Sequence, residues 1–70
     1  MSSPKRLGTL IRQLRTQRKP PLSQRALGEK VGVSDAYIAM IETGKRKNPS
    51  LALLKRIAKT LGVPVTELLS

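Results

Sequence analysis

Residues 22–45 hold a pattern of two short helices joined by a tight turn, and this pattern restricts the fold more than any other feature. Ser23 is a typical cap for the start of one helix, and Ser34 is a typical cap for the next. Gly32 stands between them, where a tight bend would require a positive φ, and Gly44 is suited to close the second helix. Two helices separated by a short glycine-containing turn are typical of a helix-turn-helix.

Apolar residues in these two helices predict which sides face a core. They recur at helical spacing in the first helix, follow the glycine in the turn, and recur in the second helix. The residues expected to point inward are Ala26, Leu27, Val31, Val33, Tyr37, Ile38 and Ile41. Because amphipathic helix pairs are common, this pattern alone does not separate a DNA-binding module from a generic helical hairpin.

The sequence before the motif predicts one further helix. Its expected apolar stripe is Leu7, Leu10, Ile11 and Leu14. This helix should end near Arg18, because the prolines of Lys19-Pro-Pro21 lack backbone donors and restrict the residues before them. Residues 1–5 are expected to form a short flexible arm, with Pro4 as a candidate helix start.

The sequence after the motif predicts two more helices. One should start at Ser50 and stop at Gly62, and a short last helix should span Val63–Leu69. The buried stripe expected in the fourth helix is Leu51, Leu54, Ile57, Ala58 and Leu61. We therefore predict an all-α fold, a compact bundle of four to five short helices that forms a single domain over residues 1–70.

Charge narrows the class of function. The chain has 14 Lys and Arg residues against 4 Asp and Glu, a net charge of +10 in 70 residues, which is typical of a protein that binds a polyanion. Tyr37 is the only aromatic residue, which argues against a base-stacking surface for single strands.

Enzymatic activity is not expected. The chain has no Cys and no His, so it lacks disulfides, zinc-type ligands and the usual general bases and nucleophiles. Its acidic residues are dispersed, and no glycine-rich phosphate loop is present. No apolar run approaches the ~20 residues of a membrane span, and the N-terminus lacks the apolar part of a signal peptide. We expect a cytoplasmic protein with no cofactor, no small-molecule ligand and no membrane partner.

Three segments carry a resemblance to a known family. They are Leu22-Ser-Gln24, Val31-Gly-Val-Ser34 and Ile41-Glu-Thr-Gly-Lys45. At this spacing, and with the Lys-rich loop that follows, they resemble the lambda-repressor-like DNA-binding domains of the Cro and xenobiotic-response-element type. The resemblance extends from about Leu7 to Leu69, and one departure is that the connection Arg18-Lys-Pro-Pro21 is longer than usual.

The resemblance implies that the second helix of the motif is a recognition helix in the major groove of DNA. The implied base-contacting residues are Ser34, Asp35, Ala36, Ala39 and Met40. None of them is Arg, Asn or Gln, the residues that usually make bidentate contacts to guanine or adenine. Two interpretations of Asp35 stay open: it accepts from a cytosine amino group, or it only stabilises the helix N-terminus. The alanines and Met40 could pack on thymine methyl groups.

The resemblance also implies contacts to the DNA backbone. The residues expected there are Gln24, Arg25, Tyr37, Lys45, Arg46 and Lys47. Gln24 opens a helix whose N-terminal amides suit a phosphate, and the basic loop would clasp the backbone. The structural alternatives are a solvated Gln24, loop cations that only complement a helix C-terminus, and a Tyr37 that is half-buried packing.

A different role is implied for Arg15 and Glu42. They fall where the family has a structural ion pair that ties the first helix to the end of the recognition helix. Such a pair would fix the angle of the recognition helix and would not itself contact DNA.

The predicted function is a sequence-specific transcriptional regulator of double-stranded DNA, most simply a repressor. The alternatives are a non-specific DNA- or RNA-binding protein and a protein-interaction module such as an antitoxin or adaptor. A weak homodimer that forms mainly on DNA is also expected. Val65 and Leu69 would contribute to its interface, while Leu68 would cap the core.

Overall fold

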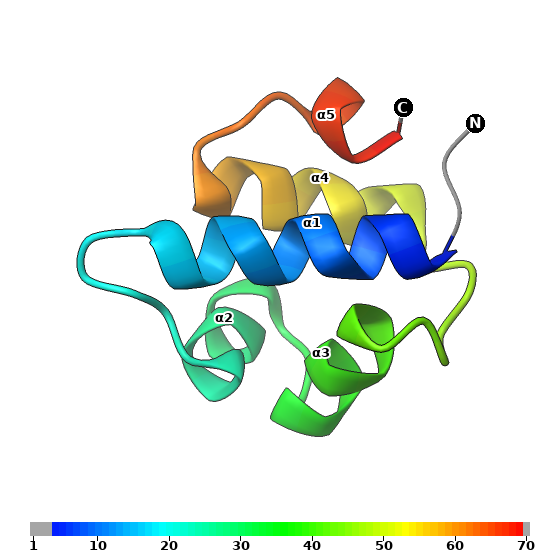
Figure 1. Ribbon diagram of the computed structural model, residues 1–70, viewed down its shortest axis with the longest axis horizontal. Helices are drawn as coiled ribbons and strands as arrows, with labels where there is room; N and C mark the ends of the chain where they lie inside the picture. Colours follow the sequence, from blue (N-terminus) through cyan, green and yellow to red (C-terminus); the bar gives the residue numbers. More distant parts are fainter. Residues whose placement is uncertain (1–3, 70) are drawn as a thin grey trace.

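The computed structural model describes residues 4–69, which form five α-helices and no strand (Figure 1). The helices are α1 (Pro4–Gln17), α2 (Gln24–Val31), α3 (Asp35–Glu42), α4 (Leu51–Leu61) and α5 (Val65–Leu69). In Figure 1, α2 and α3 lie on one side of α1 and α4, and α5 lies on the other. The predicted all-α fold with a helix-turn-helix is confirmed, with five helices.

The first helix differs slightly from the prediction at both ends. It begins at Pro4, since a proline at the first helical position loses no hydrogen bond and already has a helical φ. Lys5 therefore belongs to α1 and not to the expected arm, of which residues 1–3 lie outside the described part of the chain. The helix ends at Gln17, one residue before the predicted end.

Serine caps the starts of α2, α3 and α4, and glycine ends α2 and α4, as the sequence predicts, whereas Thr43 caps the end of α3 just before Gly44, and α5 begins at Val65, two residues later than predicted. The hydroxyls of Ser23, Ser34 and Ser50 each accept a hydrogen bond from the backbone N–H three residues later, at 2.9, 3.0 and 3.1 Å. Gly32 and Gly62 end α2 and α4 with φ angles of 87° and 75°, which residues with a side chain rarely adopt. The turn of the helix-turn-helix is therefore fixed by local chemistry on both sides.

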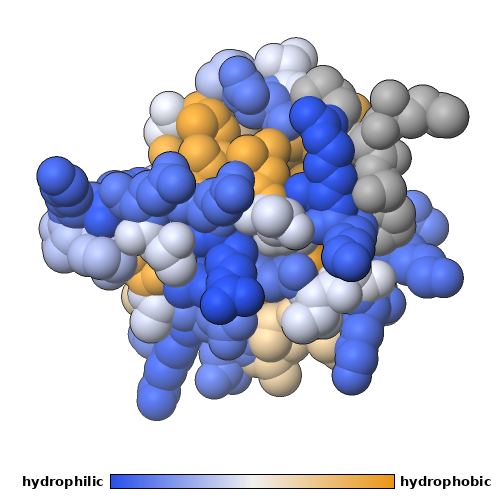
Figure 2. Space-filling view, viewed as in Figure 1, coloured by the Kyte–Doolittle hydropathy of each residue, from blue (hydrophilic) through white to orange (hydrophobic). Residues whose placement is uncertain are grey.

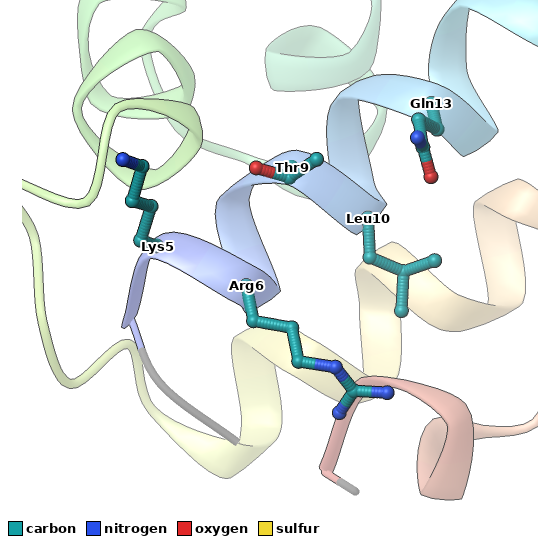
Figure 3. A pocket seen from close by; sticks show the side chains of 5 residues that line it. All are labelled: Lys5, Arg6, Thr9, Leu10 and Gln13. Carbon is teal, nitrogen blue, oxygen red and sulfur yellow. The ribbon is translucent and has the colours of Figure 1, made fainter.

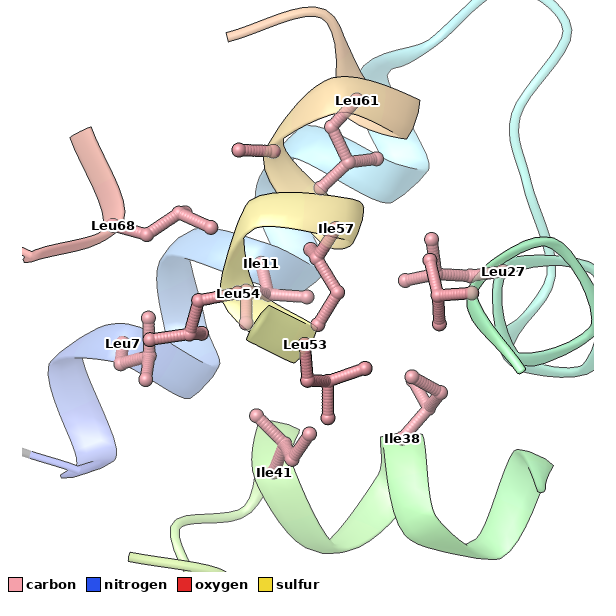
Figure 4. Close-up of a cluster of buried hydrophobic side chains, with 12 residues drawn as sticks. Leu7, Ile11, Leu27, Ile38, Ile41, Leu53, Leu54, Ile57, Leu61 and Leu68 are labelled. Atoms are coloured by element: carbon pink, nitrogen blue, oxygen red, sulfur yellow. The ribbon is translucent and has the colours of Figure 1, made fainter. Parts of the chain in front are cut away.

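The core is one apolar cluster to which all five helices contribute (Figure 4). Its least exposed side chains are Ile11, Leu27, Val31, Ile38, Ile41 and Ile57. Burial of each such side chain stabilises the fold by about 1.5–3 kcal/mol relative to its exposure. The two helices of the motif thus rest on α1 and α4, and Leu68 seals the same cluster from α5, as predicted.

The predicted burial of one residue of α4 is wrong. Leu51 is 51% exposed, and Leu53, which was not predicted to be buried, is only 6% exposed. With 3.6 residues per turn, Leu51 lies about 90° from the centre of the buried face of α4. It is also the first residue of the helix, so no preceding turn covers it. Leu53 points instead toward Ile38 and Ile41 of α3 (Figure 4).

One face of the molecule is mostly hydrophilic. Figure 2 shows polar and charged side chains over most of one face, with an apolar patch in its upper part, near α5. Within residues 4–69, no helix combines the length and the apolar character needed to cross a membrane.

Candidate nucleic-acid interface

A buried ion pair joins α1 to the end of α3. Arg15 donates from Nε to Glu42 Oε2 at 2.7 Å and from Nη2 to Glu42 Oε1 at 2.9 Å. Both residues are only 9% exposed. Two parallel bonds between a guanidinium and a carboxylate are stronger and more directional than a single contact. The structure thus brings together the two residues that the resemblance pairs, and they hold α3 at one angle to α1.

Gln24 joins this pair from the start of α2. Its side-chain amide donates to Glu42 Oε1 at 3.1 Å, so Gln24 is not simply a solvated residue. Arg15 Nη1 donates to the Leu22 carbonyl at 2.9 Å, and the Leu22 N–H donates back to the Arg15 carbonyl at 3.1 Å. No buried side-chain nitrogen or oxygen in the described part of the chain lacks a hydrogen-bond partner. A fully satisfied polar network of this kind makes its surroundings rigid.

Two glycines that the sequence patterns did not single out allow close backbone contacts, Gly8 between α1 and α3 and Gly28 between α2 and the turn that follows it. A Cβ atom on Gly8 of α1 would lie 2.3 Å from the Ile41 carbonyl oxygen of α3, and one on Gly28 of α2 would lie 2.5 Å from the Val33 carbonyl oxygen. Neither position has room for a side chain. The available signal was a lone glycine within a helical pattern, which usually has a packing reason.

The side of α3 that faces away from the core carries the predicted base-contacting residues. Ser34, Asp35, Ala36 and Met40 are exposed, and Ala39 is half-buried. Two of them also stabilise the start of the helix: Ser34 is its cap, and an Asp35 carboxylate oxygen accepts from the Ala36 N–H at 2.8 Å. Asp35 thus has a structural role as well as an exposed position.

The basic loop after α3 folds back onto that helix. The Arg46 N–H donates to the Met40 carbonyl at 3.0 Å. The Arg46 guanidinium lies over the ring of the half-buried Tyr37, 5.3 Å from its centroid, and its Nε donates to the Tyr37 hydroxyl at 3.1 Å. Lys45 and Lys47 are exposed on either side of Arg46. Tyr37 therefore combines packing with the positioning of a loop cation.

Lys5 lies next to this loop. A Cβ atom on Gly44 would stand 3.5 Å from the Lys5 Cα, so the first turn of α1 and the start of the loop are neighbours. Lys5 also borders a shallow hollow of about 430 Å³, which is lined by Lys5, Arg6, Thr9, Leu10 and Gln13 (Figure 3). In Figure 3 the Lys5 side chain extends toward α3, whereas Arg6 extends toward α5. Lys5 is thus one more cation beside the predicted DNA-binding surface.

Arg25 directly follows Gln24 in the first turn of α2. It is exposed on α2, and its Nε is 3.6 Å from a carboxylate oxygen of Glu29. Both side chains are more than 70% exposed, so this pair adds little to stability and leaves Arg25 accessible. No group of three or more His, Cys, Asp or Glu side chains within residues 4–69 could hold a metal ion.

Comparison with known proteins identifies the family. A helix-turn-helix family model matches residues 11–68. The chain is 39% identical over 62 residues to the HTH-type transcriptional regulator SlrR of Bacillus subtilis strain 168, an alignment that covers 89% of this chain and 40% of SlrR. The chain spans about two fifths of the length of this and other curated regulators that it matches.

Two solved structures share the fold over nearly the whole chain. The restriction-modification controller protein C.AhdI from Aeromonas hydrophila superposes with a TM-score of 0.82 at 32% identity, covering 93% of this chain and 94% of C.AhdI. SinR, a master regulator for biofilm formation solved in complex with DNA, gives 0.82 at 34% identity, covering 91% of this chain and 98% of SinR. The chain belongs to the Cro/C1-type helix-turn-helix family of DNA-binding transcriptional regulators, which are not enzymes.

Proposed function

We propose that this protein is a sequence-specific repressor that acts in the cytoplasm and reads the major groove of duplex DNA with α3. The observation that carries the proposal is the placement of exposed small residues on α3 beside the cations of the following loop. The Arg15–Glu42 pair supports this surface from behind at a fixed angle. A bound domain of this size represses by occupying a promoter and excluding polymerase.

Phosphates are held on both sides of the recognition helix. Gln24 uses one amide hydrogen on Glu42, which leaves the other for a phosphate beside the free N–H groups of the first turn of α2. On the other side, Lys45 and Lys47 flank Arg46, whose guanidinium is already ordered on Tyr37. Lys5 extends this group of cations, and the accessible Arg25 adds a further contact from α2.

Bases are read mainly through apolar contacts and DNA shape. Ala36, Ala39 and Met40 pack on thymine methyl groups, and Asp35 accepts from a cytosine amino group. Because no Arg, Asn or Gln reads a base, the deformability of the duplex contributes to site choice. Enrichment of random duplexes by the purified protein tests this proposal, and one preferred duplex sequence is the expected result. Equal binding of all duplexes, or of RNA, would favour the non-specific alternative.

Binding is expected to depend strongly on salt. The cations assigned to the backbone imply about 3–5 neutralised phosphates, so a plot of log affinity against log salt should have a slope of about −3 to −5 per protomer. Replacing Lys45 and Arg46 with alanine should flatten this slope by about 1–2 and leave the preferred sequence unchanged. Fluorescence anisotropy over a salt series measures both quantities. A slope near zero for the unmodified chain would contradict the assignment.

We further propose that two copies bind one palindromic site and touch weakly through α5. Half-sites in such operators lie about 34–36 Å apart. Leu69 is 48% exposed and Val65 is half-buried, next to the buried Leu68. An apolar surface of this small size supports a contact that forms on DNA but not a stable dimer in solution.

The change Leu69→Lys is expected to abolish cooperative binding to the two half-sites, because it places a charge in the contact. Sedimentation should show a monomer at micromolar concentration, and titration of a palindromic duplex should show two copies. Gln17→Lys adds the same charge at the exposed end of α1, away from α5, and should keep the cooperativity (Figure 1). Independent half-site binding by the unmodified chain would refute the contact.

A further inference from the structure

A second group of positively charged side chains lies away from the basic loop that follows α3. A hollow of about 470 Å³ is lined by Arg18, Lys30, Arg56, Lys59 and Thr60, and we call it the cationic hollow. Its residues come from three places: the segment after α1, the last turn of α2, and α4. In Figure 1 the ends of α1 and α4 lie at the left of the long axis, whereas the loop after α3 lies at the right. The hollow and the basic loop after α3 therefore lie at opposite ends of the molecule.

No acidic side chain neutralises the cationic hollow. Within residues 4–69, Arg15 pairs with Glu42 and Arg25 pairs with Glu29. Neither ion pair involves a cation of the hollow. Four positive charges from three segments thus line the hollow without a carboxylate partner. Their mutual repulsion raises the free energy of the folded chain, and a bound anion would relieve it.

One of the four cations, Arg18, is held in place before any ligand arrives, and a second, Arg56, lies beside the end of α2. The Arg18 Nη1 donates to the Thr60 carbonyl at the end of α4. The Arg56 Nη1 lies 3.9 Å from the position that a Cβ atom would take on Gly32. A guanidinium that is already ordered loses less conformational entropy on binding, and its planar fork matches the oxygens of a phosphate.

Helix capping explains only part of this arrangement. Lys30 and Lys59 lie in the last turns of α2 and α4, where a cation interacts favourably with the helix dipole. Arg56 lies before the last turn of α4, so the dipole does not account for its place in the hollow. A ligand with several negative charges accounts for all four cations.

We propose that the cationic hollow binds a phosphate-chain anion of the triphosphate type, which it recognises through the phosphates alone. Its volume is within the range of about 300–1,000 Å³ typical of small-molecule sites. Two guanidinium forks and two ammonium groups suit several phosphates at once, and the Thr60 hydroxyl adds a neutral donor. No aromatic ring lines the hollow, so nothing there stacks on a nucleobase. A rigid duplex presents its phosphates on a convex ridge, which fits a hollow less well than a flexible chain does.

The test is a titration of the 70-residue chain with tripolyphosphate, followed by backbone amide NMR and by thermal unfolding. The amides of Lys30, Gly32 and Thr60 are expected to shift, and the melting temperature is expected to rise with the concentration of the anion. The double change Arg56→Gln with Lys59→Gln should weaken the binding by about tenfold or more, because it removes two charged donors. Arg56→Lys keeps the charge without the fork and should give an intermediate loss.

The matched control is Lys45→Gln with Lys47→Gln, which removes the same charge from the proposed DNA-binding surface. It should leave the anion-induced shifts at the hollow nearly unchanged. Equal weakening by both double variants would mean that the anion responds only to net charge, and the proposal would be wrong. If the hollow responds to excess duplex but not to tripolyphosphate, its ligand is a second DNA molecule, which also overturns the proposal. Amide spectra without anion show whether each variant is folded.

Discussion

Replacing Glu42 with alanine is expected to lower the free energy of unfolding by about 3–5 kcal/mol, because it leaves a buried guanidinium without its partner. Arg15 is only 9% exposed and donates two bonds to Glu42, which also accepts a bond from Gln24. A domain of this size has a total stability of about 4–10 kcal/mol, so the variant should be largely unfolded at modest temperature. Urea denaturation followed by circular dichroism measures the change.

Two comparison variants separate support of the fold from contact with DNA. Arg15→Leu combined with Glu42→Leu removes both charges and should recover much of the lost stability. Its DNA affinity should stay low, because nothing then fixes the angle of α3. Ala36→Gln, at an exposed position on α3, should leave stability nearly unchanged and alter which duplexes bind. Equal losses of stability in Glu42→Ala and Ala36→Gln would show that the base-reading surface is misassigned.

The helix ends could be predicted from the sequence because their chemistry is local. Ser23 and Ser34 each accept a hydrogen bond from an N–H only three residues away, and the positive φ of Gly32 is required by the turn itself. Neither the cap nor the turn depends on where the rest of the chain goes. The Arg15–Glu42 pair spans 27 residues and came only from the family resemblance, because no local rule links the two positions.

Features that depend on the tertiary fold could not be predicted from local patterns. The apolar pattern of α4 predicts roughly which side of the helix is buried, but not which part of that side α3 covers. For this reason Leu51 was wrongly predicted to be buried, and the burial of Leu53 was not predicted. The contact between Tyr37 and Arg46 exists because the loop turns back onto α3. The cationic hollow is a similar case, because its residues come from three separate segments that no local pattern brings together.

The close approach of α1 and α3 depends on the missing side chain of Gly8. A Cβ atom there would lie 2.3 Å from the Ile41 carbonyl oxygen, 2.5 Å from the Glu42 carbonyl oxygen and 2.7 Å from the Glu42 carbonyl carbon. All three are backbone atoms, so no side-chain rotation relieves the overlap. A methyl group at Gly8 must therefore push the end of α3 away from α1. The displaced backbone belongs partly to Glu42, whose side chain forms the ion pair with Arg15.

Gly8→Ala is accordingly expected to lower the free energy of unfolding by about 1–3 kcal/mol through overpacking, and to weaken DNA binding further than the unfolded fraction explains. The second effect follows because displacement of α3 moves every base-reading side chain together.

Gly62→Ala is the matched control: its φ of 75° makes alanine strained, but nothing lies within 4 Å of the added Cβ. That variant should lose about 1–2 kcal/mol of stability while its folded molecules keep normal DNA affinity. Denaturation together with DNA titration well below the melting temperature distinguishes the two. If Gly8→Ala and Gly62→Ala lose affinity only in proportion to their unfolded fractions, the approach of α1 to α3 stabilises the fold but does not set the position of the recognition helix.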